Sequence, residues 1–253
     1  MTPANVKFPA ATAALAATLL FGATPASAQV QWIGRGIVTG SIGVQSGSQD
    51  VTTVARQEIY EETATTTARQ EIGSGPLFEI SGGYLVWRNL LVGAGFSRFS
   101  DSSPASVEAS IPHPLLFETF RNATVSAGDL DHSETAFHVT GTWMIPLTTK
   151  VEVALFGGPS FFSIKQEFVS GVAFTEVGDP FNAINLGAPT IAEASESAVG
   201  FHLGADVTYL VTPRIGVTGF ARIARASAKF DAIDGAEIDA GGPQIGVGVR
   251  YRF

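Results

Sequence analysis

Two histidines and one serine have the side-chain types that nucleophilic catalysis needs. His138, His202 and Ser160, together with a carboxylate, would supply the groups of a Ser-His-acid triad. Such a triad works only when its members lie within hydrogen-bonding reach of one another. The sequence contains no Gly-x-Ser-x-Gly motif, and the two histidines fall on predicted strands that are not neighbours. We therefore interpret both histidines as hydrogen-bonded interior residues, and we expect neither catalysis nor a cofactor.

Charged and polar side chains also recur at alternate positions of several segments. By this alternation one face carries Arg35, Glu79, His138, Glu152, His202, Asp206, Arg222, Arg250 and Arg252. If these faces line one enclosed space, each charge needs a partner, because an unpaired buried charge is costly. Arginines and carboxylates occur in roughly matching numbers, so the pattern predicts an internal salt-bridge network. The alternative is a polar path that lets small ions leak when a pair rearranges.

Two further polar motifs are weaker. The acidic stretch Asp129–Glu134 suggests a metal, but its spacing does not fit a calcium loop, so we expect no metal site. His113 lies between two prolines and could contact a ligand, although a folded loop motif is the simpler interpretation. The acidic stretch is therefore assigned to a solvated loop and His113 to a folded one.

The elements that must position these side chains are strands, as the last segment shows most clearly. From Gln244 to Phe253, large apolar residues alternate with glycine and polar residues, which is the period of a β-strand. Its apolar positions are Ile245, Val247, Val249, Tyr251 and Phe253. In a membrane barrel such a face meets lipid, and its aromatic residues lie at the interface.

The same alternation predicts eight strands. They lie near residues 32–46, 78–86, 90–96, 137–145, 150–155, 199–209, 215–223 and 244–253. Short turns are predicted at 87–89, 146–149 and 212–214, and long outer loops near 46–72, 100–134, 165–196 and 229–240. The first loop contains a repeated Ala-Arg-Gln-Glu-Ile and is expected to be a hairpin that turns near 61–66; the second and third are expected to be irregular. Alternating short and long connections are typical of an all-β, antiparallel, up-and-down transmembrane barrel.

Composition and the first residues agree with this fold class. Residues 1–28 have one lysine, an apolar run and a small-x-small ending, which predicts a secretory signal peptide that is cleaved after Ala28. The barrel is expected over 29–253. The chain is 45% hydrophobic, contains 28 Gly and 18 Phe, and has 15% charged residues against about 25% in soluble domains. It has no cysteine, and its net charge of −8 argues against nucleic-acid binding.

Short motifs carry a family resemblance. The ending Val249-Arg-Tyr-Arg-Phe253 resembles the assembly signal of bacterial outer-membrane proteins, with Val249, Tyr251 and Phe253 as its apolar positions. The segments 86–93 and 210–217 resemble turns of the small eight-stranded barrels, the group of the OmpA barrel and OmpX. The resemblance implies export to the outer membrane, insertion by the barrel-assembly machinery, and contact with outer-membrane lipid and lipopolysaccharide.

The fold alone leaves the activity open, because such barrels have many functions. We expect a monomer with a structural or surface-interaction role, with mobile outer loops as the contact surface and a lumen plugged by charged side chains. A narrow cation-preferring channel is the second hypothesis, and a lipid-directed enzyme is the third. Arg98, on the outward face near the outer rim, could meet a lipid phosphate.

Overall fold

The computed structural model describes residues 34–47, 49–230 and 236–253. Over these residues the chain forms one antiparallel sheet of ten strands. The strands are β1 (Gly36–Gln45), β2 (Gln49–Ile59), β3 (Glu62–Ile72), β4 (Gly75–Trp87), β5 (Leu90–Pro112), β6 (Phe120–Pro146), β7 (Val151–Val177), β8 (Ala183–Leu210), β9 (Ile215–Phe230) and β10 (Ala236–Arg252). Within this described part, no helix is long and apolar enough to cross a membrane.

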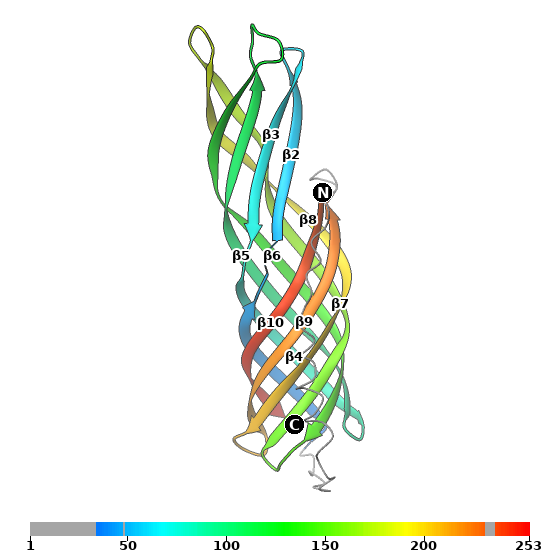
Figure 1. Cartoon of the computed structure of the whole chain (residues 1–253). Coiled ribbons are helices and arrows are strands. Elements are labelled where there is room, and N and C mark those ends of the chain that lie inside the picture. Colours follow the sequence, from blue (N-terminus) through cyan, green and yellow to red (C-terminus); the bar gives the residue numbers. More distant parts are fainter. Residues whose placement is uncertain (1–33, 48, 231–235) are drawn as a thin grey trace, which may run out of the picture. The chain divides into compact units, whose positions relative to one another are not determined.

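Eight of the described strands close into a ring (Figure 1). β1 pairs with β4 on one side and with β10 on the other, and each strand from β4 to β10 pairs with the next. The last residue completes the closure, because Gly36 and Phe253 exchange two backbone hydrogen bonds of 2.8 and 3.0 Å. A closed ring leaves no unpaired strand edge in its wall.

The part of the ring near the short turns has an apolar outer face that is bordered by aromatic residues. At the end with the short turns, the exposed aromatic side chains are Tyr84, Trp87, Trp143, Tyr209, Tyr251 and Phe253. Toward the opposite end they are Phe78, Phe96, Phe137, Phe161 and Phe201. Two aromatic girdles around an apolar band are the pattern that a transmembrane barrel presents to a bilayer. We call the two sides of this band the inner end, which has the short turns, and the outer end.

Beyond the outer girdle, the outward face of the strands changes from apolar to polar, and the inward face changes from polar to apolar. On β5, Phe96 is exposed and Ser97 is buried, whereas ten residues later Ser106 is exposed and Val107 is buried. The change begins at Arg98, the first exposed charged residue after the outer girdle on this strand. Lipid favours apolar outward faces and water favours polar ones, so one strand crosses from a bilayer environment into an aqueous one.

The segments beyond the outer girdle form their own packed unit, which we call the outer extension. The β2–β3 hairpin turns at Tyr60 and Glu61, which both have positive φ, and β3 then pairs with the outer half of β5. Two apolar clusters fill the extension: Ala68, Ala105, Val107, Leu130 and Val169, and Ala64, Ala109, Ile111 and Ile184. Side chains from β3, β5 and β6 meet side chains from β7 and β8 in these clusters, so the extension has a core of its own.

These features correct several expectations. The segments 100–134 and 165–196, predicted as irregular loops, are mostly strand: β5 continues to Pro112, β6 begins at Phe120, β7 continues to Val177 and β8 begins at Ala183. Segment 46–72 is the predicted hairpin, but it turns at 60–61. The three short turns lie within one or two residues of the predicted ones.

Other expectations fall at the edges of the described chain. Arg35 does not lie in the lumen: it precedes β1 and is exposed, because regular pairing begins only at Gly36. The predicted signal peptide, 1–28, and the tip of the last outer loop, 231–235, lie outside the described residues.

Candidate functional sites in the lumen and at the outer apex

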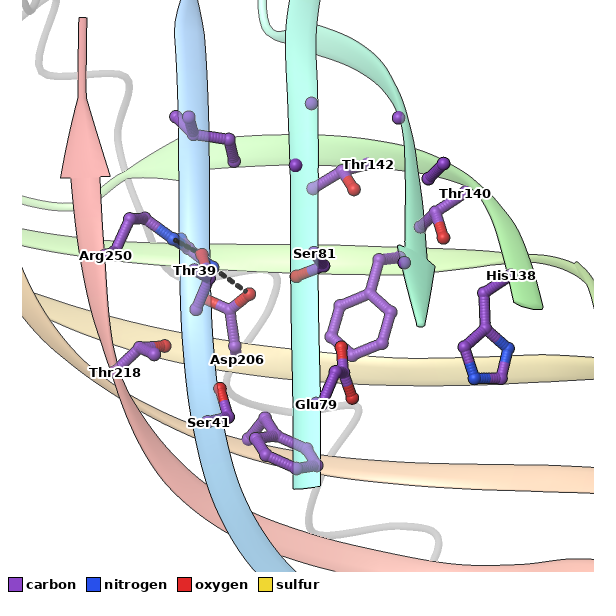
Figure 2. Close-up of a pocket in the computed structure, with 18 of the residues that line it drawn as sticks. Thr39, Ser41, Glu79, Ser81, His138, Thr140, Thr142, Asp206, Thr218 and Arg250 are labelled. Carbon is purple, nitrogen blue, oxygen red and sulfur yellow. Dashed lines mark hydrogen bonds and ion pairs between the residues drawn. The ribbon is translucent and has the colours of Figure 1, made fainter. Parts of the chain in front are cut away.

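Two ion pairs occupy the middle of the lumen. Arg222 on β9 reaches Glu79 on β4, with Nη1 2.8 Å from Oε2, and both side chains are buried or nearly so. Arg250 on β10 donates from Nη2 to Asp206 Oδ2 on β8 at 2.7 Å, and its Nε donates to Thr39. Figure 2 shows Arg250, Thr39 and Asp206 together at this level. The first pair bridges over β1 and β10 and the second bridges over β9, so both brace the barrel from within.

A third pair lies nearer the inner end. Arg252 contacts Glu152 of β7, and each side chain is at most 3% exposed. Beside it an apolar layer of Ile37, Leu91, Met144 and Ala154 fills the inner end of the lumen. The lumen therefore holds an ion pair and packed aliphatic side chains at this level, and the alternation rule alone did not predict the apolar part.

A chain of hydrogen bonds leads from Arg222 toward the outer end. Arg222 Nε donates to Gln244 at 2.5 Å, and Gln244 Nε2 donates to Gln45 at 2.6 Å. Gln45 in turn donates to Glu134 at 3.1 Å, and the other oxygen of Glu134 lies 3.1 Å from His132 Nε2. This series of hydrogen bonds connects β9, β10, β1 and β6. A polar network therefore crosses the lumen and links strands that are distant in the sequence.

The two predicted histidines are linked through the serine between them. His138 Nδ1 lies 2.8 Å from Ser160 Oγ, and Ser160 Oγ lies 2.9 Å from His202 Nδ1. Their outer nitrogens bond Ser97 at 2.9 Å and Thr140 at 3.1 Å. β6 and β8 are not paired with each other, but both pair with β7, which places Ser160 between the rings.

This cluster has the components of a catalytic set without the arrangement of one. All four ring nitrogens of His138 and His202 are engaged by hydroxyl groups, so no carboxylate orients either ring. Ser160 is fully buried, with 0% of its surface exposed. A serine nucleophile also needs access for a substrate, and Ser160 is buried.

Apolar residues also fill the lumen above the polar level. One cluster contains Ala136, Phe162, Ile164, Ala198, Ala224, Ala226, Ala228, Phe230, Ile238 and Ala240, with Val51 and Ile72 of the first hairpin. These alanines and phenylalanines point inward although the alternation rule assigned polar residues to the interior. A signal was present in the sequence, because Ala224, Ala226 and Ala228 alternate with Arg225, Ser227 and Lys229, and these polar residues need water.

At the far end of the outer extension, a buried arginine ties three hairpin tips together. Arg121 of β6 contacts Glu176 of β7 and donates to the backbone carbonyls of Phe181 at 3.0 Å and Pro112 at 2.6 Å. Tyr60, at the β2–β3 turn, donates to Glu176 at 3.0 Å. We call this set of residues the apex latch. It fixes the relative positions of the β2–β3, β5–β6 and β7–β8 tips.

The latch has ionisation properties that follow from its contacts. The hydrogen bonds from Arg121 and then Tyr60 hold the pKa of Glu176 below its usual value of 4.5. The pKa of Tyr60 is raised above 10.0, first by partial burial and then by its bond to the Glu176 carboxylate. The latch is therefore intact over the range in which Glu176 is ionised and Tyr60 is neutral.

Next to the latch, the β5–β6 turn is folded but its apolar side chains are exposed. His113 is buried, lies 3.1 Å from the Pro180 carbonyl, and accepts a hydrogen bond from the Leu115 amide at 3.1 Å. Leu115, Leu116 and Phe117 are 70%, 54% and 75% exposed. We call these three residues the apex patch. His113 is thus a folded-loop residue, as the sequence suggested, and the residues after it were not anticipated as a site.

The structure also shows where the residues of the predicted assembly signal and of the acidic stretch lie. Val249, Tyr251 and Phe253 face outward, with the rings of Tyr251 and Phe253 stacked at 6.2 Å. The acidic stretch divides between faces, since Asp129 and Asp131 are exposed while Glu134 is buried. In the described part of the chain, no three His, Asp or Glu side chains gather in a way that could hold a metal ion.

A closed antiparallel ring with an apolar outer band, two aromatic girdles and charged residues inside defines a transmembrane β-barrel. The chain belongs to the family described as outer membrane protein beta-barrel domain, whose model matches residues 13–253. It is therefore a bacterial outer-membrane protein. No curated protein is similar to it in sequence at a significant level.

Three solved structures illustrate the similarity. Neisserial surface protein A is 13% identical, with 86% of this chain and 96% of that chain covered and a TM-score of 0.47. The outer membrane protease OmpT of Escherichia coli is 10% identical, with 86% and 97% covered and a TM-score of 0.44. The attachment invasion locus protein Ail of Yersinia pestis, in complex with the heparin analogue sucrose octasulfate, is 13% identical, with 87% and 99% covered and a TM-score of 0.38. The family assignment rests on the sequence match, and these similarities add no argument about activity.

Proposed function

We propose that this protein is a non-conducting, non-enzymatic outer-membrane barrel that holds a rigid binding surface outside the cell. The observation that carries the proposal is the outer extension, in which strands rather than mobile loops end in the exposed apex patch of Leu115, Leu116 and Phe117. The extension is ordered by its own apolar clusters. The loss of conformational entropy therefore accompanies folding, and it does not have to accompany the binding of a partner. A pre-ordered surface of this kind suits recognition.

The apex patch has the composition of a contact site. Large apolar side chains that are exposed together on a fixed turn mark interaction surfaces in soluble segments. Three acidic residues lie on the same tips: Glu61 and Glu118 are exposed, and Glu62 is half-buried and accepts a hydrogen bond from the Glu118 amide at 2.9 Å. Arg121, three residues after Glu118 in the sequence, is buried and paired with Glu176. Charge complementarity therefore favours a protein partner with an apolar pocket and a basic rim.

The closed lumen supports the proposal over the channel hypothesis. Opening a path would require separating at least one buried arginine–carboxylate pair, and would also require moving the apolar layer around Met144. The fully buried Ser160, whose histidine neighbours lack an orienting carboxylate, supports the absence of catalysis.

The membrane contacts belong to the same proposal. Arg98 is exposed and lies two residues beyond Phe96 on the outward face of β5. A lipopolysaccharide phosphate would lie at this level. The outward row of Val249, Tyr251 and Phe253 is available to the barrel-assembly machinery before β10 pairs with β1. We further propose that the barrel functions as a monomer, since its wall is already closed.

The binding proposal is tested with cells that display the protein. Cells are washed over a layer of a basic protein (lysozyme) and, in parallel, an acidic protein (albumin). We expect preferential retention on the basic layer, and a several-fold loss of retention for the double variant Leu116→Ser/Phe117→Ser, because the apolar contact is removed. The matched control is Leu147→Ser, which changes a leucine of similar exposure on an inner turn.

Equal retention on both layers would contradict the proposed partner chemistry. Equal retention of the double variant and the parent would contradict the apex patch as the contact site.

A further inference from the structure

A cavity of about 70 Å³ lies in the lumen between the two central ion pairs. Its lining includes Glu79, Asp206, Thr218, Arg222 and Arg250, and Figure 2 shows all of these except Arg222 labelled around the space. The hydroxyl and carboxylate groups of the lining come from β1, β4, β6, β8 and β9. Polar groups therefore reach the cavity from five strands, beside apolar lining residues such as Phe156 and Phe220, and the cavity is not used by the proposed surface interaction.

Three polar groups in this lining have no protein partner among the described residues. They are the Nη2 group of Arg222, the Nη1 group of Arg250 and the hydroxyl of Thr218. The residues are only 4%, 5% and 2% exposed, so bulk solvent does not satisfy these groups. Buried donors without acceptors are rare in native proteins, and a buried ligand commonly completes them. The unused groups line one shared space, so one ligand cluster can complete all three.

The charge of the site identifies the ligand class. Each arginine already has its own carboxylate, at 2.8 Å for Arg222 and Glu79 and at 2.7 Å for Arg250 and Asp206. The formal charges of these four residues cancel, so an anion would lose its hydration without gaining a net positive site. A neutral ligand that both accepts and donates hydrogen bonds matches two arginine donors beside two carboxylates.

We propose that the cavity is a permanent water site, in which about two water molecules join the two central ion pairs into one network. A water molecule needs roughly 10–15 Å³ of a cavity measured in this way, so the cavity admits at least two. One water accepts from Arg222 Nη2 and one from Arg250 Nη1, and the Thr218 hydroxyl bonds to the pair. The site is then an internal brace of the barrel, and it is independent of what the apex patch binds.

The test is a crystal structure of the purified barrel, with one set of crystals soaked in bromide. We expect two ordered waters within hydrogen-bonding distance of Arg222 Nη2 and Arg250 Nη1, and no anomalous bromide signal between them. Thr218→Val, which keeps the side-chain shape and removes the hydroxyl, should displace at least one of these waters. Thr175→Val, an exposed threonine of β7, is the control and should leave both in place.

Four results would overturn the proposal. A bromide peak between the arginines would make the site an anion site. A cavity without ordered density would leave the donors unsatisfied, and arginines that turn to other protein groups would remove the site. Unchanged waters in Thr218→Val would exclude the hydroxyl from the network.

Discussion

Buried arginines organise this molecule at two separate levels. Arg222 and Arg250 join strands across the lumen, and Arg121 joins three hairpin tips outside the membrane band. In each place the guanidinium is paired with a carboxylate and also bonds an uncharged oxygen of the protein. Loss of one partner would leave an uncompensated buried charge, so these residues are expected to be the most sensitive positions outside the apolar clusters.

The apex latch should be sensitive to acid. The folded state holds the pKa of Glu176 below 4.5, so the contribution of this carboxylate to stability is present at neutral pH and is lost as pH falls through the lowered value. We expect the ring signals of ¹³C-labelled Tyr60 to shift in that acidic range, because its acceptor becomes protonated. Glu176→Gln should show no acidic transition, while signals of Tyr209 at the inner girdle stay constant as the control. An acidic shift that persists in Glu176→Gln would contradict the latch.

The face of each lumen residue was predictable, whereas its partner was not. Alternation along single strands places Glu79, Asp206, Arg222 and Arg250 inside, because a strand has a period of two. Pairing Arg250 with Asp206 also depends on the stagger of three strands around the ring, and no local pattern encodes that stagger. The same limit explains why His138, Ser160 and His202 could be proposed as a set but not joined: the linking role of Ser160 follows from the register of β7.

At the level of the elements, strands β5 to β8 are continuous across two environments. Their apolar faces point outward through the membrane band and inward above it. A sequence interpretation that expects the same face to be apolar along the whole strand predicts no strand after Phe96. Pro104 and Pro112 also argue against a strand there, because proline is rare inside a sheet. In the structure Pro104 is exposed and Pro112 is the last residue of β5. The membrane-spanning part of the barrel was therefore predictable, whereas the outer extension, apart from its β2–β3 hairpin, was not.

The inversion of faces predicts different effects for neighbouring substitutions in the outer extension. Val107 is 0% exposed in an apolar cluster, so Val107→Asp buries an unpaired carboxylate and should destabilise the extension by about 3 kcal/mol or more. Ser106→Asp places the same group in water and should have little effect. Limited proteolysis of the detergent-solubilised protein measures the effects of both substitutions. Val107→Asp should be cleaved within the extension while the heat-modifiable gel shift of the barrel remains, and equal protection of the two variants would contradict the packing described.

At the level of the whole molecule, a barrel with charged and apolar layers inside continues into an ordered outer extension. The lumen alternates between apolar and polar layers, with Met144 near the inner end, the ion pairs in the middle and Phe162 above them. Packed layers of this kind are expected of a protein core. In the proposed function, the barrel provides the anchor, and the apex patch provides the surface that reaches a partner.

Planar-bilayer recording tests the sealed barrel most directly. The purified chain is inserted into a bilayer at defined salt, with a large general porin as the positive control for insertion and detection. We expect no reproducible conductance steps from this protein, because three buried ion pairs of the described lumen and two apolar layers would have to move together. Reproducible steps from the parent protein, with its insertion confirmed by heat-modifiable mobility, would contradict the sealed lumen and would favour a channel.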